Sequence, residues 1–447
     1  MLNLIDKLRA MSKSNFVRGG AGTIVIRLSD VGSNLLLAIV LARFLGANEY
    51  GIYAFVYASV TLAAIPVQFG LPSLVVRETA KFASLGLWGS IRGLWRWSNQ
   101  IIFLTSAVLL GVGAVVIFVA YGDASHAKLL TFIWGGLLIP LIGFESLRGS
   151  SLRGLGKVVQ GLLPDRVIRP SLLIVIASIA YLVFGVKLRS YTAMALHVVA
   201  AGMAFAVGVY LLRRDNIYRK VREHVAEFTA KKWIWSAVPL GLVAAVTQIN
   251  TKIDIVMLGM YVDPTQVGIY RVASVGATAV GLGYNALGIV SMPYFSRLHN
   301  QNRTGELQRL ATNVARAGVV LATPVLLGFL FFGKEILSLL FGNKYAGAYE
   351  VLAVLSVVQF INLSYGKLGT LLNMCGHEKE TLVIMCISAV ANVAMNALLI
   401  PSYGMMGAAL STGMSYIIWK SMLWYTVRKK LSMDGSALGL RLAPKTY

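Results

Sequence analysis

Long apolar runs without a single charged residue constrain this chain more than any other feature. Residues 381–419 contain no Asp, Glu, Lys or Arg, and neither do residues 50–76 or residues 98–120. A transmembrane helix needs about 20 consecutive, mostly apolar residues. Only 13% of the 447 residues are charged, about half the share that is typical of soluble domains. The sequence therefore predicts an all-α polytopic membrane protein.

The apolar runs predict about twelve transmembrane helices. The run at residues 381–419 is long enough for two of them, with a break at residues 401–404, where Pro and Gly interrupt the helical pattern. The first span, residues 17–45, differs from the charge-free spans because it contains Arg27 and Asp30. The other spans are residues 50–76, 98–120, 129–144, 170–186, 190–212, 233–251, 272–296, 317–333 and 351–366.

The net charge of +23 has two readings, which the positions of the charges separate. Basic residues that bind nucleic acid gather on a polar folded domain, whereas basic residues of membrane proteins gather in cytoplasmic loops. With both termini in the cytoplasm, 29 of the 41 basic residues fall in cytoplasmic segments, six in outer loops and six inside helices. This bias predicts a multi-pass membrane protein with cytoplasmic termini and excludes nucleic acid as a partner.

The two halves of the chain show signs of a parallel repeat. The tripeptide Gly-Ile-Tyr at residues 51–53 recurs at residues 268–270, an offset of 217, and residues 184–186 correspond to residues 403–405 at an offset of 219. Because six helices is an even number, the two halves have the same orientation. We therefore predict two six-helix lobes.

The predicted domain boundaries follow from the repeat and the basic segments. Residues 1–213 form the N-terminal lobe, residues 214–232 a basic cytoplasmic linker, residues 233–428 the C-terminal lobe and residues 429–447 a basic cytoplasmic tail. The start of the chain, residues 1–16, is either a short interfacial helix or a polar lead-in to the first span.

Several short motifs follow one another along most of the chain. They are Ala42-Arg43-Phe44-Leu45-Gly46 with Tyr50-Gly51, Gly70-Leu71-Pro72 through Arg77-Glu78, Asp254 with Met257-Leu258-Gly259, Val267-Gly268-Ile269-Tyr270, and Tyr403-Gly404 with Gly407-Ala408-Ala409. In this order the motifs resemble the pattern of polysaccharide-unit flippases (Wzx type, for O-antigen, capsule or exopolysaccharide) of the multidrug/oligosaccharidyl-lipid/polysaccharide exporter superfamily.

The resemblance implies a V-shaped exporter fold that works by alternating access. It also implies a substrate, an undecaprenyl-diphosphate-linked oligosaccharide, which is moved from the cytoplasmic to the periplasmic leaflet of a bacterial inner membrane during lipopolysaccharide or exopolysaccharide biosynthesis. Membrane lipids, a polysaccharide polymerase and a chain-length regulator are the other implied partners. Coupling to H+ or Na+ is implied, with no other cofactor.

Charged residues inside the apolar spans are the candidate binding groups. A charge at membrane depth is costly unless it is paired or lines a wet cavity, and an anionic head group needs a substitute for its hydration. Arg and Lys donors provide that substitute for phosphate oxygens. We therefore predict a cationic cavity that includes Arg27, Lys252, Arg271, Arg77 and Arg316.

Two acidic residues, Asp30 and Asp254, are the candidates for ion coupling. Lys252 and Asp254 are two positions apart, so they cannot both point squarely at the same lumen. The alternatives are structural. Arg27 and Asp30 can pair within their helix, and Arg77 and Arg271 lie close enough to helix ends to reach the interface.

Catalysis is poorly supported by the sequence. It lacks the GxxxxGK[ST] loop that cradles phosphates, and its five histidines are scattered without metal-binding spacing, so no metal site is predicted. The rival functions are a cation-coupled multidrug exporter of the same superfamily, a flippase for the peptidoglycan lipid precursor, and a membrane-bound polymerase or ligase. The excess of bases over acids inside the spans argues against the first, and short outer loops argue against the last.

Overall fold

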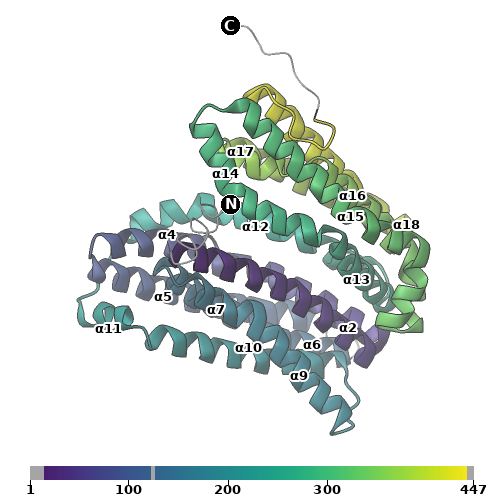
Figure 1. Ribbon diagram of the computed structural model, residues 1–447. Helices are drawn as coiled ribbons and strands as arrows, with labels where there is room; N and C mark the ends of the chain where they lie inside the picture. Colours follow the sequence, from purple (N-terminus) through teal and green to yellow (C-terminus); the bar gives the residue numbers. More distant parts are fainter. Residues whose placement is uncertain (1–14, 122–125, 440–447) are drawn as a thin grey trace, which may run out of the picture. The chain divides into compact units, whose positions relative to one another are not determined.

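A computed structural model describes residues 15–121 and 126–439, in which the regular elements are helices and no strand occurs (Figure 1). The interfacial helix considered for residues 1–16 falls almost entirely outside the described residues. The helices are α2 (Asn15–Ala63), α3 (Ile65–Gln68), α4 (Leu71–Ser84), α5 (Trp88–Tyr121), α6 (His126–Gly136), α7 (Leu138–Gly154), α8 (Val158–Leu163), the π-helix η1 (Pro164–Ile168), α9 (Arg169–Leu182), α10 (Ser190–Arg213), α11 (Asn216–Glu223), α12 (Ala230–Tyr261), α13 (Pro264–Thr278), the 3-10 helix η2 (Ala279–Gly281), α14 (Leu282–Asn300), α15 (Thr304–Phe341), the 3-10 helix η3 (Asn343–Ala348), α16 (Tyr349–Ser364), α17 (Leu368–Met374) and α18 (Glu378–Leu431).

The predicted spans are helical, and several of them merge into longer helices. Eight helices in the described part of the chain are long and apolar enough to cross a membrane. Two of these, α2 and α18, each contain two consecutive predicted spans or parts of them. The span at residues 170–186 is the shorter α9, and the span at residues 272–296 is divided among α13, η2 and α14. These observations confirm the predicted all-α polytopic class.

Glycine in a left-handed conformation produces the bends inside the two longest helices. Gly46 in α2 has φ 73° and Gly404 in α18 has φ 53°, a region that L-residues with a side chain rarely adopt. An ideal Cβ at Gly46 would meet no atom within 4 Å, so backbone conformation and not space requires glycine there. The bend at Gly404 confirms the break predicted at residues 401–404.

The chain divides into two compact units. Unit 1 comprises the described residues within Met1–Phe44 and Ser59–Ala245. Unit 2 comprises Leu45–Ala58 and the described residues within Val246–Tyr447. Helices α2 and α12 therefore contribute residues to both units. The lobe boundaries predicted at residues 213 and 233 stay a prediction.

Unit 1 is packed through glycines where helices approach closely. An ideal Cβ at Gly143 in α7 would lie 2.7 Å from Val67 and 2.9 Å from Ile102. Gly149 in α7 and Gly161 in α8 face each other, because a Cβ on either one would lie 2.5 Å from the carbonyl oxygen of the other. Small residues at such crossings let helix backbones approach in a membrane, where packing is a main source of association energy.

The segment predicted as a linker, residues 214–232, is anchored to unit 1. Asp215, directly before α11, forms an ion pair with Lys157. The Glu227 backbone N–H donates to the Gly89 carbonyl over 3.1 Å. A Cβ at Gly93 in α5 would lie only 1.7 Å from the Glu227 carbonyl oxygen. The segment therefore has a defined path along the start of α5.

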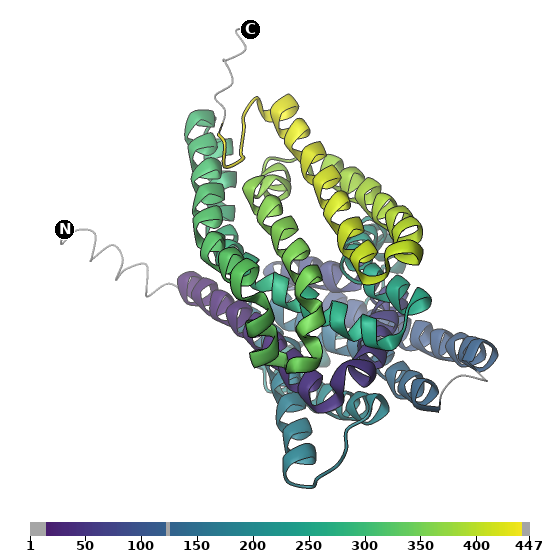
Figure 2. The ribbon, with the colours of Figure 1, turned by 90° about the vertical axis from the view of Figure 1, so that its right-hand side faces the viewer.

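Within unit 2, α14, α15, α16, α17 and α18, coloured green to yellow in Figure 2, pack against one another. Its core includes Leu307 from α15, Leu368 and Leu372 from α17, and Leu423 and Val427 from α18, all of them fully buried. Each such side chain is removed from solvent and lipid and stabilises the bundle through close packing. Residues 45–58 of α2, which belong to unit 2, pack on α13.

That crossing of α2 and α13 joins the two halves of the repeat. A Cβ at Gly51 would lie 1.7 Å from the Pro264 carbonyl oxygen, and a Cβ at Gly268 would lie 2.1 Å from the Ala47 carbonyl oxygen. The two contacts are related by the offset of 217 residues found in the sequence. Asn48 Nδ2 also donates to Oγ1 of the residue at that offset, Thr265, over 3.4 Å. Equivalent residues of the repeat thus meet across a local two-fold relation.

Candidate functional site

Two of the predicted substrate-binding cations meet in unit 2. The Arg271 guanidinium on α13 lies close enough to the Tyr50 hydroxyl on α2 to interact with it electrostatically. Lys252 on α12 has its Nζ 5.7 Å from the centroid of the Tyr57 ring. The like charges of Lys252 and Arg271 are close enough to interact. An anion placed between them would relieve that repulsion.

A row of tyrosines lies on α2 beside these cations. Tyr50 and Tyr53 stack with ring centroids 6.3 Å apart, and Tyr53 and Tyr57 stack with centroids 6.1 Å apart. Their spacing of three and four residues places all three rings on one helix face. Cationic donors are suited to phosphate oxygens, and tyrosine rings add apolar area with a hydroxyl at the edge. The combination is suited to a head group that carries phosphate and sugar.

Asp254, two residues after Lys252, lies in a separate polar network. Its Oδ1 accepts a hydrogen bond from Asn396 Nδ2 over 2.8 Å. Its Oδ2 accepts from Thr412 Oγ1 over 2.7 Å and from the Tyr270 hydroxyl over 3.4 Å. Asn396 Nδ2 also donates to Asn392 Oδ1 over 2.7 Å. The carboxylate is thus held by neutral donors, an arrangement that leaves it able to take up a proton or a small cation.

The predicted residues of unit 1 have different surroundings. Asp30 on α2 accepts a hydrogen bond from Arg166 in η1 over 3.0 Å. This ion pair replaces the pairing of Asp30 with Arg27 that was considered from the sequence. Arg27 is exposed on α2, and Arg77 is exposed on α4 and pairs with the glutamate next to it at 3.0 Å. These residues belong to a different unit from Lys252.

Arg316, the fifth predicted cation, holds the segment that follows α18. Its Nε donates to the Ala437 carbonyl over 2.9 Å, and its Nη2 reaches the Leu438 carbonyl at 3.5 Å. The same segment contains Asp434, which is fully buried and accepts a hydrogen bond from Trp424 Nε1 over 3.1 Å. Arg316 therefore has a defined structural contact, and the structure does not join it to the cluster of Lys252 and Arg271.

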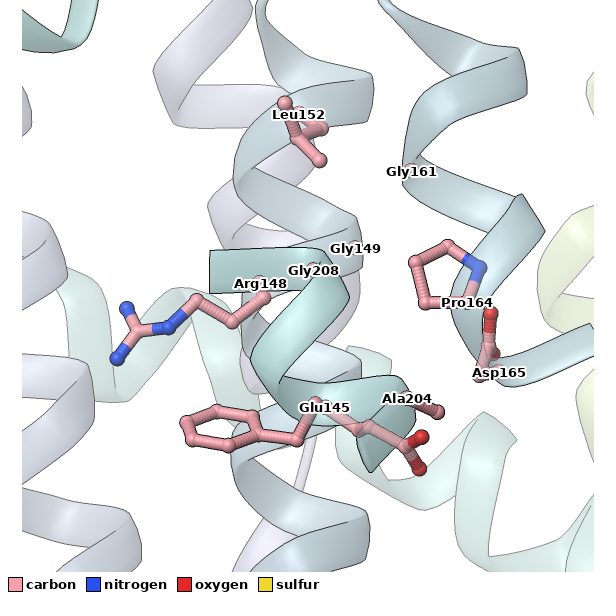
Figure 3. Close-up of a pocket in the computed structure, with 10 residues that line it drawn as sticks. Glu145, Arg148, Gly149, Leu152, Gly161, Pro164, Asp165, Ala204 and Gly208 are labelled. Atoms are coloured by element: carbon pink, nitrogen blue, oxygen red, sulfur yellow. The ribbon is translucent and has the colours of Figure 1, made fainter. Parts of the chain in front are cut away.

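Glu145 on α7 forms an ion pair with Arg169 in unit 1. Its Oε2 accepts a hydrogen bond from Arg169 over 2.8 Å, and its side chain is only 3% exposed. Figure 3 shows Glu145 and Asp165 on one side of a small pocket and the Arg148 side chain pointing the other way. The pocket has a volume of about 10 Å³, room for about one water molecule.

Sequence reasoning missed the partners that define these sites. Asn392 and Asn396 are uncharged and lie four residues apart in the run at residues 381–419, which was read only as apolar. Two buried amides on one helix face, with Thr412 beyond the predicted break, are the signal that could have identified the partners of Asp254. Among the described residues there is no group of three or more His, Cys, Asp or Glu that could hold a metal ion.

Comparison with known proteins places this fold in a family. The family model described as "Polysaccharide biosynthesis protein" matches residues 17–299, more than half of the chain. The chain is also similar to the probable low-salt glycan biosynthesis flippase Agl15 of Haloferax volcanii. The two are 22% identical over 411 residues, which cover 90% of this chain and 82% of that relative.

Solved structures show the same fold. An inward-facing multidrug resistance MATE family transporter of the MOP superfamily matches with a TM-score of 0.76 and 14% identity, over 92% of this chain and 98% of that one. The lipid II flippase MurJ in an inward closed conformation matches with a TM-score of 0.71 and 15% identity, over 92% of this chain and 87% of that one. The family match and the similarity to Agl15 confirm the resemblance predicted from the sequence, and the solved structures agree with it in fold. The chain therefore belongs to the polysaccharide biosynthesis protein family and is a multi-pass membrane protein with the fold of these two solved structures.

Proposed function

We propose that this protein is a flippase that moves a lipid-linked oligosaccharide from the cytoplasmic to the periplasmic leaflet of a bacterial inner membrane, with an undecaprenyl-diphosphate carrier. The family match carries the proposal, and similarity to a probable glycan flippase over nine-tenths of the chain supports it. Alternating access is the mode of transport that suits this exporter fold. The concentration of basic residues in the predicted cytoplasmic segments supports cytoplasmic termini.

Lys252 and Arg271 are the residues that we propose bind the diphosphate. Both lie in mostly apolar helices, where an uncompensated charge is costly. Arg271 presents permanently charged donors and Lys252 a mobile ammonium group, which together replace water around phosphate oxygens. Tyr57, the partly exposed end of the tyrosine stack on α2, provides a surface for the adjoining sugar. The isoprenoid tail needs no polar contact and can remain in lipid.

Asp254 is the residue that we propose couples transport to H+ or Na+. Its oxygens are held by Asn396, Thr412 and Tyr270, none of which neutralises its charge. Asn396 also has a buried Oδ1 that accepts no hydrogen bond from the described residues. A carboxylate together with an unused amide oxygen provides the hard oxygen ligands that a small cation requires. Asp30 is a weaker candidate because Arg166 already compensates its charge.

The proposal is tested by reconstitution of the protein into liposomes with a fluorescent lipid-linked oligosaccharide, followed by measurement of its movement between leaflets. We expect Lys252→Met with Arg271→Met to reduce the rate about tenfold or more, because two charged hydrogen-bond donors are lost. Lys344→Met, at an exposed lysine in the same unit, is the matched control. Wild-type liposomes that move the lipid no faster than empty ones would exclude the proposed function.

A further inference from the structure

The end of α10 carries a hollow in unit 1, the α10 groove. It has a volume of about 450 Å³ and is lined by Ala206, Val209, Tyr210, Arg213 and Arg214. This volume lies within the range of about 300–1,000 Å³ that is usual for small-molecule sites. In the predicted topology this end of α10 is cytoplasmic. The lining joins an apolar and aromatic part to two adjacent arginines, so it suits a molecule that has an apolar part and an anionic group.

The groove continues an exposed stripe along α10. Val199, Met203 and Tyr210 are 50%, 46% and 60% exposed. Together with Ala206 they recur at intervals of three and four residues, which places them on one helix face. Because α10 is long and apolar enough to cross a membrane, this face is a surface for lipid chains. From Val199 to Arg213 the stripe is about 21 Å long at a rise of 1.5 Å per residue, enough for the hydrocarbon depth of one leaflet, about 15 Å.

The two arginines have no acidic partner in the described part of the chain. Arg213 and Arg214 are exposed, and neither forms an ion pair there. The acid that follows them directly, Asp215, is buried and forms an ion pair with Lys157. Its Oδ1 also accepts a hydrogen bond from the Ile217 backbone N–H over 2.9 Å, at the start of α11. The nearest acid in the sequence is therefore occupied by other groups.

A third arginine adds to this positive charge. Arg148 on α7 lies close enough to Arg213 for their like charges to interact. The printed partners of Arg148 are neutral: its Nη2 reaches Asn99 Oδ1 at 3.4 Å, and its Cζ lies 5.7 Å from the centroid of the Phe205 ring. Like charges at the edge of an apolar region repel one another, and a bound anion lowers that repulsion.

We propose that the α10 groove binds an anionic glycerophospholipid of the cytoplasmic leaflet. Arg213 and Arg214 contact its phosphate, since guanidinium groups form charged, paired hydrogen bonds with phosphate oxygens. Basic pockets at the cytoplasmic side of transmembrane helices suit such head groups. An acyl chain lies along the apolar stripe, and Tyr210 lies at the boundary between the chain and the head group.

The charge of the lining selects the class of lipid. Among the described residues that line the groove there is no Asp or Glu. The ammonium group of a zwitterionic lipid therefore finds no carboxylate there, whereas a lipid with net negative charge compensates the arginines. This lipid is a constituent of the bilayer and not the transported substrate, so the site is independent of the proposed function.

Quenching of a fluorophore on the stripe by brominated lipid tests the inference. Cys375 and Cys386 are changed to serine, and Met203→Cys is labelled with bimane in the full chain, in phosphatidylcholine bilayers. Brominated phosphatidylglycerol or brominated phosphatidylcholine is added at the same low molar fraction. We expect phosphatidylglycerol to be enriched about fivefold or more at the label, because each basic residue near the surface favours anionic lipid. Equal quenching by the two lipids would overturn the inference.

Variants matched in charge locate the preference. Arg213→Gln with Arg214→Gln removes both cations of the groove and should lower the enrichment to about twofold or less. Arg219→Gln with Arg222→Gln removes the same charge from exposed positions on α11 and should leave the enrichment unchanged. An equal fall in the two double variants would indicate a diffuse field of the basic segment and would refute a site in the groove.

Thermal stability gives a second measurement. A ligand that binds the folded protein raises its melting temperature by mass action. Phosphatidylglycerol should therefore raise the melting temperature more than phosphatidylcholine, and this difference should disappear in the groove variant and persist in the α11 variant. A difference that persists in the groove variant would refute the assignment of the site.

Competition identifies the occupant. Undecaprenyl phosphate also combines a phosphate with an apolar chain. If it displaces brominated phosphatidylglycerol at a much lower molar fraction than unlabelled phosphatidylglycerol does, the groove belongs to the carrier and the inference is overturned. A lipid preference that depends on the two groove arginines, in a protein that flips no lipid-linked oligosaccharide, would support the lipid site and refute only the proposed function.

Discussion

The crossing of α2 and α13 predicts that a single added methyl group will separate the two helices. In Gly51→Ala the new Cβ would lie 1.7 Å from the Pro264 carbonyl oxygen, whereas ordinary contact begins at 3.4 Å. The obstacle is backbone, which cannot rotate aside like a side chain. The helices must therefore move apart by about 1.7 Å, and a gap of even 0.5–1 Å loses about a quarter to a half of the attraction between packed atoms. Overpacking costs about 1–3 kcal/mol, and we expect this close contact to lie at the upper end.

The same reasoning fixes an order of effects. Gly268→Ala places its Cβ 2.1 Å from the Ala47 carbonyl oxygen and needs a shift of about 1.3 Å, so its cost should be smaller. One separation of the helices relieves both clashes, and the double variant should therefore cost less than the sum of the two. Gly328→Ala, in α15 with open space around the added Cβ, is the control and should stabilise the helix by up to about 1 kcal/mol.

A disulfide cross-link between the two helices measures their separation. The hydrogen-bonded positions Asn48 and Thr265 are replaced by cysteine after the native Cys375 and Cys386 have been changed to serine. A cost of about 3 kcal/mol corresponds to a fall of about a hundredfold in the population of the close crossing and in the rate of oxidation. A cross-linking rate and a melting temperature that remain those of the parent in Gly51→Ala would show that the helices do not cross at this glycine pair.

Three further predictions concern charged residues. Asp254→Asn keeps the size of the side chain and removes its charge, so the dependence of transport on a H+ or Na+ gradient should disappear. Asp263→Asn, at an exposed residue next to α13, is the control and should retain that dependence. Gradient dependence that persists in Asp254→Asn would contradict the coupling role. Glu145→Ala removes the buried acid of the ion pair with Arg169 and should destabilise the protein by about 3 kcal/mol, against less than about 1 kcal/mol for Glu306→Ala at an exposed ion pair. Equal melting temperatures for these two variants would remove the argument from burial. Arg316→Met removes hydrogen bonds to the segment after α18, so limited proteolysis should cleave that segment faster than in the wild type. Transport of lipid-linked glycan should be less affected than in the Lys252 and Arg271 variants. Proteolysis at the wild-type rate would show that the segment is held by other contacts.

Much of the fold could be read from residue type alone. Charge-free runs of about 20 residues are helical in a membrane because backbone groups must satisfy their hydrogen bonds within the segment. The break in the last run followed from Pro401 and Gly404, and the structure bends at that glycine. The repeat offset of 217 residues was visible in a tripeptide, although the sequence did not indicate that Gly51 and Gly268 meet.

The assembly of each site could not be read in this way. Lys252 and Asp254 are near neighbours in sequence, but one lies beside the tyrosines of α2 and the other among the amides of α18. Arg316 resembled the other intramembrane cations and instead binds backbone carbonyls after α18. Lys367 and Lys420 are 53 positions apart and line one cavity.

The sequence by itself determined that the chain spans a membrane, which segments are helical, and which few residues carry charge into apolar surroundings. Those properties follow from the transfer of each side chain and its backbone from water to hydrocarbon, which depends mainly on residue type. Only the tertiary structure decided which charges are compensated and which polar atoms are left unpaired. Electrostatic and hydrogen-bond energies change over a few ångströms, and helix packing sets those distances between residues far apart in the chain.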